Sequence, residues 1–257
     1  MYNQIVKVKL MENKIKFITT ELVEDIEEIK PIPAGQHLPE WFKNAPPNKV
    51  GAITIKGCMP LQDSMTSGYL LRLPQDMTIH FNVMDKVEKK KMIKIDFAMG
   101  QHDLNNPSFQ NDPEPHSTNQ VGGPKSYIAE ENSPEGVCPI PKIINPFKII
   151  TPPGWSCLFV PPFHREEDYF KILPGIVDTD IYPQVVNFPF TFNRHKYPSF
   201  IKTLKRGMPY AQVIPFKRSN WKMEVSYVKE LNRLSLNWAT KILNRYKSIW
   251  WNKKKYK

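Results

Sequence analysis

The stretch Pro174-Gly-Ile-Val-Asp-Thr-Asp-Ile-Tyr182 decides how the rest of the chain is interpreted. It opens with a proline–glycine turn pair and continues with two β-formers. Asp178 and Asp180 then stand at i and i+2, which places both carboxylates on one face of an extended segment. Two like charges held close together can raise the pKa of one of them, or create a site for a metal ion or an activated water. The alternative is a structural Asp-rich turn, in which Asp178 accepts backbone hydrogen bonds.

Length and composition indicate one large β domain or one domain with an appendage. The chain has 257 residues, of which 40% are hydrophobic, enough for a substantial core. It contains 25 prolines, which are poorly tolerated in helix interiors and central strands, so we expect short strands joined by rigid turns. The cysteines, Cys58, Cys138 and Cys157, are too scattered for a disulfide scaffold or a metal-binding pair. This cysteine pattern favours a reduced, cytoplasmic setting.

The positive charge is concentrated at the C-terminus. Residues 214–257 contain 12 Lys/Arg and 2 Asp/Glu, which gives net +10, whereas residues 1–213 contribute only +1. No run approaches the ~20 apolar residues of a membrane-spanning helix, and the N-terminus lacks the apolar core of a signal peptide. We therefore expect no transmembrane segment.

Alternating apolar residues predict antiparallel strands over roughly 50–220, including a strand at 53–59. The clearest feature is a hairpin in which the apolar residues of 77–83 face those of 93–99. Residues 100–146 are irregular, and their His, Asp and Glu residues match no metal-ligand spacing, so we predict a long surface loop and no metal site. The predicted organisation is an N-terminal extension (1–30), a β domain (31–224) with an insertion at about 100–146, and a basic C-terminal helix and tail (225–257).

From residue 221 onward the apolar period changes from two to about 3.6, which predicts an amphipathic helix near 227–248 of about six turns. Its cations and the aromatic tail suit nucleic acid, because phosphates attract Lys and Arg while bases stack on aromatic rings. An acidic partner, a membrane surface and a merely solvated face are the alternatives. The residues predicted to contact nucleic acid are Lys241, Arg245, Lys247, Trp250, Trp251, Lys253, Lys254 and Lys255.

Four segments resemble, in order, the motifs of the trimeric dUTPase family, whose relatives include the dCTP deaminases. These segments are Ser67–Leu73 (SGYLLRL), Pro161–Arg165 (PPFHR), Gly175–Tyr182 (GIVDTDIY) and Arg206–Ile214 (RGMPYAQVI). The resemblance implies a mainly β fold, a dUTPase-like β-clip of antiparallel strands. It also implies a homotrimer with pockets shared between subunits.

The resemblance also implies functional roles. Asp178 would be the base that activates water, and the ligand-binding residues would be Tyr69, Asp180, Tyr182, Arg206 and Gln212. Tyr182 is displaced by one position from the family pattern, which turns its side chain to the opposite face unless a bulge corrects it. Pro161 and Pro162 replace a phosphate-binding Arg-Ser pair and supply neither a cation nor a backbone N–H.

We therefore expect a degenerate dUTPase-like protein that acts by binding a nucleotide ligand or by assembly, without catalysis. The alternative is a nucleotide pyrophosphatase or deaminase acting on dUTP or dCTP, with a phosphate site rebuilt from His164, Arg165 or Arg206. Mg²⁺ would be needed only if nucleotides are hydrolysed. The whole sequence also resembles a family encoded by marine tailed phages, which implies a protein made in the host bacterial cytoplasm, with virion association as a further option.

Overall fold

The computed structural model describes most of the chain. The described residues are 14–19, 26–47, 54–87, 90–99, 141–165, 169–193, 196–197, 199–227 and 246–257. Only the backbone is described for 82–87, 90–99 and 248–249.

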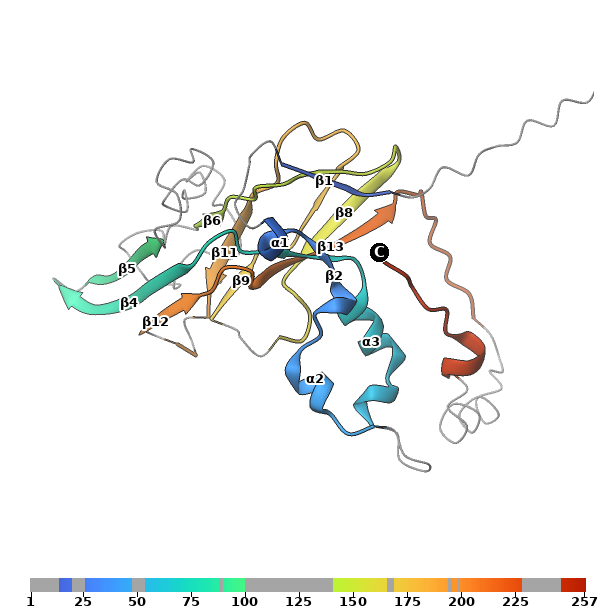
Figure 1. Ribbon diagram of the computed structural model, residues 1–257, viewed down its shortest axis with the longest axis horizontal. Coiled ribbons are helices and arrows are strands. Elements are labelled where there is room, and N and C mark those ends of the chain that lie inside the picture. Colours follow the sequence, from blue (N-terminus) through green and yellow to red (C-terminus); the bar gives the residue numbers. More distant parts are fainter. Residues whose placement is uncertain are drawn as a thin grey trace, which may run out of the picture.

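The fold is mainly β and antiparallel, as predicted (Figure 1). The strands are β1 Lys16–Ile18, β2 Ile32–Pro33, β3 Tyr69–Arg72, β4 Met77–Val87, β5 Lys90–Met99, β6 Lys142–Ile143, β7 Lys148–Ile150, β8 Trp155–Val160, β9 Phe170–Ile172, β10 Gly175–Val177, β11 Phe188–Phe192, β12 Ser199–Leu204 and β13 Pro209–Lys217. The helical segments are α1 Ile26–Ile29, α2 Glu40–Asn44, α3 Met59–Thr66, two 3₁₀ turns (Ala34–Gln36 and Ile55–Gly57) and a π turn at Tyr246–Trp250.

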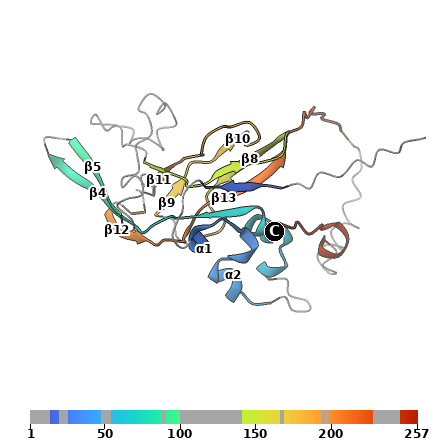
Figure 2. The ribbon, with the colours of Figure 1, turned by 45° about the horizontal axis from the view of Figure 1, so that its top comes forward.

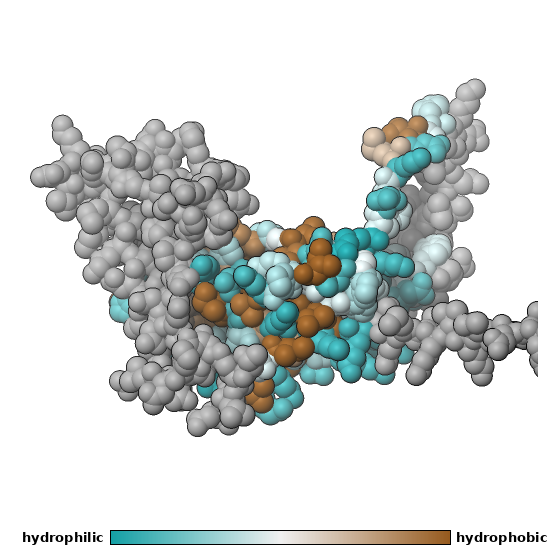
Figure 3. All heavy atoms as spheres, turned by 90° about the horizontal axis from the view of Figure 1, so that it is seen from above, coloured by the Kyte–Doolittle hydropathy of each residue, from teal (hydrophilic) through white to brown (hydrophobic). Residues whose placement is uncertain are grey.

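The strands form several small sheets. The largest has the order β10-β8-β13-β3-β2, and three-stranded sheets have the orders β6-β11-β9 and β12-β4-β5. β1 pairs with β7. The β4–β5 ribbon extends to one side of the molecule, while α2 and α3 lie below the largest sheet in the view of Figure 1 (see also Figure 2). Figure 3 shows the molecule from above, with the described residues coloured by hydropathy.

β13 is the central strand of the largest sheet, with β8 on one side and β3 on the other. Its residues 210–213 are all buried, as expected for a strand covered on both faces. The approach of β3 requires a glycine: Gly68 has φ +72°, and a Cβ there would lie 1.9 Å from the carbonyl oxygen of Val213. Gly68 therefore permits the close pairing at the centre of the sheet.

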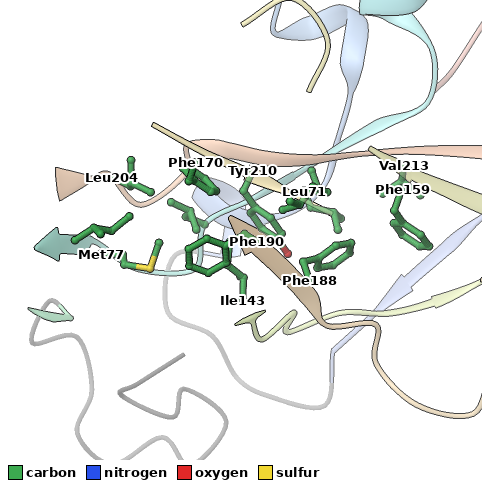
Figure 4. Close-up of a cluster of buried hydrophobic side chains, with 14 of the residues drawn as sticks. Leu71, Met77, Ile143, Phe159, Phe170, Phe188, Phe190, Leu204, Tyr210 and Val213 are labelled. Atoms are coloured by element: carbon green, nitrogen blue, oxygen red, sulfur yellow. The ribbon is translucent and has the colours of Figure 1, made fainter. Parts of the chain in front are cut away.

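One hydrophobic cluster joins the sheets (Figure 4). Phe188 from β11 packs edge-on against Phe159 from β8 and Tyr210 from β13, at centroid distances of 5.3 and 5.4 Å. Tyr210 is fully buried, and burial raises its pKa above the usual range. Because residues from different sheets meet here, the separate sheets behave as one packed body.

Two sequence predictions were tested clearly by the fold. The hairpin is confirmed, with Met77 opposite Met99 and Phe81 opposite Ile95, although the strands run further toward the turn than expected. The strand predicted at 53–59 is wrong, because residues 55–57 form a 3₁₀ turn and α3 begins at Met59. Pro60 lies in the first turn of α3, a position that suits proline and disfavours a central strand.

The predicted C-terminal helix falls largely on 228–245, outside the described residues. Residues 218–227 have no regular secondary structure, and the helical segment described beyond them is the π turn at Tyr246–Trp250. Most of the predicted insertion, 101–140, also lies outside the described residues. Within the described part of the chain, no helix combines the length and apolar character needed to cross a membrane.

Candidate functional site

The Asp178–Asp180 pair is bound to an arginine that follows β13, two strands away from β10 in the same sheet. Arg218, directly after β13, grips Asp180 with both guanidinium nitrogens, Nη1 at 2.8 Å from Oδ1 and Nη2 at 2.5 Å from Oδ2. The backbone N–H of Gly154 also donates to Asp180, at 2.8 Å. The Asp180 side chain is only 5% exposed, and the hydrogen bond from Arg218 lowers its pKa to about 2.

Asp178 lies on the same side of the turn and shares the same cation. Its Oδ1 accepts a 2.6 Å hydrogen bond from Ser156 Oγ and lies 3.2 Å from Arg218 Nη1. The two carboxylates therefore lie together, but in the turn after β10 and not along one face of an extended strand, and the guanidinium of Arg218 bridges them. The Asp178 carbonyl also accepts from the N–H of Ile181 and Tyr182, at 3.1 and 2.9 Å. These contacts support the structural interpretation of the turn.

Gln212 is completely engaged within the protein. Its Nε2 donates to the carbonyls of Ser64 and Ser67, at 2.8 and 2.7 Å, and its Oε1 accepts from the Phe163 N–H at 3.1 Å. The side chain is 1% exposed. Gln212 thus ties β13 to α3 and to the loop that follows β8.

The remaining predicted ligand residues lie in different surroundings. Tyr69 packs edge-on against Phe17 and Tyr256, at centroid distances of 5.4 and 5.9 Å. Arg206 pairs with Glu28 at 3.0 Å. Tyr182 is partly exposed on the turn after β10. The structure therefore brings Asp178, Asp180 and Tyr182 together but places Tyr69, Arg206 and Gln212 elsewhere.

A large cleft lies away from the carboxylate pair. Its volume is about 870 Å³, within the range of small-molecule sites. It lies among α2 and the residues before it, the loop after β8, β9, β12 and the turn into β13. The lining residues that carry its chemistry are His37, Glu40, Trp41, Phe163, His164, Arg165, Lys171, Lys202, Lys205 and Arg206.

The described lining of the cleft is strongly cationic. Five lysines and arginines line it, whereas Glu40 is the one carboxylate among the described lining residues. Glu40 itself is paired with Lys43 at 2.6 Å. Lys171, Lys202 and Arg165 form no ion pair with any carboxylate in the described part of the chain. Such an excess of cations in a concave site favours an anionic occupant.

Arg165 is the most constrained of these cations. Its Nη1 lies 3.1 Å from His37 Nδ1, and its Nη2 donates to the His37 carbonyl. Its Nε is buried and has no hydrogen-bond partner among the described residues. Burial lowers the pKa of Arg165, and burial together with the Arg165 charge lowers the pKa of His37. Because a guanidinium can only donate, His37 Nδ1 is the acceptor in their contact.

The loop at 161–165, which lines the cleft, contains a residue with a strained backbone conformation. His164 has φ +57°, the only positive φ among the described non-glycine residues. Trp41 Nε1 donates to the His164 carbonyl at 2.7 Å, and His164 Nε2 lies 3.0 Å from Ser64 Oγ. Together with the Gln212–Phe163 bond, these contacts hold a conformation of the kind that concentrates at binding sites.

The C-terminal tail contacts the body near this region. Trp251 Nε1 and Lys254 Nζ both reach Asp63 Oδ2, at 3.0 and 2.6 Å, and Tyr256 packs on Tyr69. In Figure 2 the C-terminus lies beside α3. Among the residues predicted to contact nucleic acid, Lys241 and Arg245 lie outside the described residues and Trp251 is half-buried. The exposed ones are Lys247, Trp250, Lys253, Lys254 and Lys255.

No family model matches this chain, and no curated protein matches it significantly. The resemblance to the dUTPase family and to phage proteins therefore stays a prediction. Among the described residues, no three His, Cys, Asp or Glu side chains are grouped to hold a metal ion. Sequence analysis singled out three of the cleft residues, His164, Arg165 and Arg206, as an alternative phosphate site, but it did not find Trp41, Lys171 or Lys202. The proline pair of the PPFHR segment was the one sequence feature that could have pointed to this loop as part of the site.

Proposed function

We propose that the protein binds a small phosphorylated ligand with a flat ring, of the nucleotide class, in the cleft at 161–165. The observation that carries the proposal is Arg165, a partly buried guanidinium that lines the cleft and has no carboxylate partner among the described residues. Leaving a buried charge without a counter-charge is costly, and a phosphate supplies both the charge and the acceptor oxygens.

The other lining groups suit the same ligand class. Lys171 and Lys202 add two cations without carboxylate partners in the described part of the chain, enough to balance a di- or triphosphate together with Arg165. Trp41 and Phe163 provide flat apolar surface in the same cleft, of the kind on which nucleobases stack. The combination of phosphate charge and a ring is what distinguishes a nucleotide from an inorganic anion.

Binding without hydrolysis is the simpler function for this arrangement. Asp178, the expected base, is not among the cleft-lining residues and is occupied by Ser156 and Arg218. Glu40, the carboxylate in the described lining, is exposed and paired with Lys43. No carboxylate of the described lining is therefore buried or held ready to activate a water.

The proposal is tested by titration calorimetry with dUMP, dUTP and dCTP, beside pyrophosphate and deoxyuridine. The double variant K171Q/K202Q should bind dUTP at least about 10-fold more weakly, because two phosphate-facing cations are lost. K217Q changes the same type of residue at the exposed end of β13, outside the cleft, and should retain wild-type affinity. Absence of binding by the wild type, or equal losses in K217Q, would overturn the proposal.

A further inference from the structure

A second surface is independent of the cleft: the segment 219–227, called the arm below. It follows β13, has no regular secondary structure and leaves the end of the largest sheet (Figures 1 and 2). Trp221, Met223, Val225 and Tyr227 are each between 85% and 91% exposed. Four large apolar side chains so open to water on one short segment indicate a surface that is covered in the functional state.

The arm has the pattern of a β-strand. Its large apolar residues occupy every second position, with Lys222, Glu224 and Ser226 between them, so the period of about 3.6 expected after Trp221 does not hold over the arm. In an extended chain this alternation gives one apolar and one polar face. The arm therefore carries the sequence of a strand but pairs with no other strand among the described residues.

The start of the arm is fixed in place. Arg218 is bound to Asp180 and Asp178, donates to the Trp155 carbonyl at 3.0 Å, and its backbone N–H donates to the Gly154 carbonyl at 2.8 Å. The nine residues that follow can span about 30 Å when extended, which is enough to reach a neighbouring molecule.

We propose that the arms of two copies of this chain pair as an antiparallel two-stranded ribbon, centred on Met223, and so form a two-fold dimer. In this register Lys222 of each copy lies opposite Glu224 of the other. Trp221 lies opposite Val225 in the same way, and Met223 lies opposite its own counterpart. Opposite charges and apolar pairs placed directly across a ribbon both stabilise it, and each pair occurs twice because the interface is symmetric.

The charges select this register over its neighbours. A ribbon centred on residue 222 would set Lys222 against Lys222, and one centred on 224 would set Glu224 against Glu224. Like charges directly opposite are destabilising. A register centred between two residues would set apolar side chains against polar ones. The sequence of the arm is thus self-complementary around Met223.

The ribbon also has apolar surface to pack on. A two-stranded ribbon alone is only marginally stable in water. The edge strand β10 and the turn after it expose Ile176 (63%) and Ile181 (73%), next to the Asp180 that holds the start of the arm. Packing of the ribbon against this surface in the dimer buries apolar area from both.

A charge-swap experiment tests the pairing directly. The wild type, K222E, E224K and the double variant K222E/E224K are compared by sedimentation over a range of concentrations. Each single reversal sets like charges opposite each other at two places and should weaken dimerisation by about 10-fold or more. The double variant restores opposite charges and should dimerise within about 3-fold of wild type. All of these positions are exposed, so the variants keep the body fold.

Cross-linking provides a second measurement. Met223 is the one position of the arm that faces its own counterpart, so M223C should form a disulfide-linked dimer under mild oxidation, because opposed Cα atoms lie within disulfide range. N220C, which faces Ser226, is the matched control and should cross-link much less. A wild-type monomer at about 0.1 mM, single reversals that leave association unchanged, a double variant that fails to recover, or binding of the arm to anionic vesicles without dimerisation would each overturn the proposal.

Discussion

Replacing Gly68 by alanine tests whether the close approach of β3 and β13 is as tight as the structure indicates. The new Cβ would lie 1.9 Å from the Val213 carbonyl oxygen and 2.8 Å from its carbon, so one strand must move by more than about 1 Å. The left-handed φ of +72° adds about 1–2 kcal/mol for a residue with a Cβ. Since Val213 lies on a central strand with partners on both sides, we expect a total loss of at least about 3 kcal/mol in the free energy of unfolding.

Two other glycines separate these contributions. Gly154 has φ +81° but open space around its missing Cβ, so G154A should lose only the conformational part, about 1–2 kcal/mol. Gly175 has open space and no left-handed φ, so G175A should change stability by less than about 0.5 kcal/mol. Urea denaturation followed by tryptophan fluorescence gives all three values. If G68A and G154A agree within about 0.5 kcal/mol, the steric part of the reasoning is wrong.

Four further predictions concern the site and the tail. Arg218 lowers the pKa of Asp180 to about 2, so the ionised Asp180 should stabilise the fold at pH values above its ordinary pKa of about 4. This contribution should disappear as the pH falls toward 2 and should be absent in D180N, and thermal unfolding measured over a range of pH checks both. Q212L leaves two half-buried carbonyls and one half-buried N–H without their partner and should cost about 1–2 kcal/mol in urea denaturation, with weaker dUTP binding by calorimetry. Wild type and D178A should release equally little pyrophosphate from dUTP and ammonia from dCTP with Mg²⁺ present, and turnover by wild type alone would contradict the binding function. D63N removes the carboxylate that holds the tail, so it should speed tail proteolysis and, if the tail binds nucleic acid, strengthen salt-sensitive binding of single-stranded DNA in a gel-shift assay.

Local patterns in the sequence were sufficient for some of the fold. The hairpin follows from strict alternation on both strands, since a one-residue slip would expose the buried set. Asp178 and Asp180 do reach the same guanidinium, but the turn that begins at Asp178 brings them together, and the period of a strand does not, because β10 ends at Val177. The strand predicted at 53–59 failed because alternation over so few residues does not distinguish a strand from helical turns. Pro60, in the first turn of α3, was the contrary signal.

Long-range contacts explain what the sequence could not reveal about the site. Arg218 lies 38 residues beyond Asp180, and the two meet because β8 and β13 pair beside β10. The cleft is assembled from segments around residues 37–41, 161–165, 170–171 and 202–210. No single segment has a ligand-binding spacing of its own. The net charge of the cleft depends on which of its cations form ion pairs with carboxylates, and these pairs form only when the segments come together in the folded chain.

β13 connects the cleft and the arm, but through different residues. Gln212, near its middle, reaches the 161–165 loop and so affects the cleft, whereas Arg218, just after its end, holds the start of the arm. The Gln212 contacts are uncharged, and they are buried or half-buried, so salt and acid have little effect on them. The Arg218 contacts depend on two ionised carboxylates, one of them half exposed. The middle of β13 and the residue just after its end therefore respond to different conditions, and loss of the arm's anchor need not disturb ligand binding.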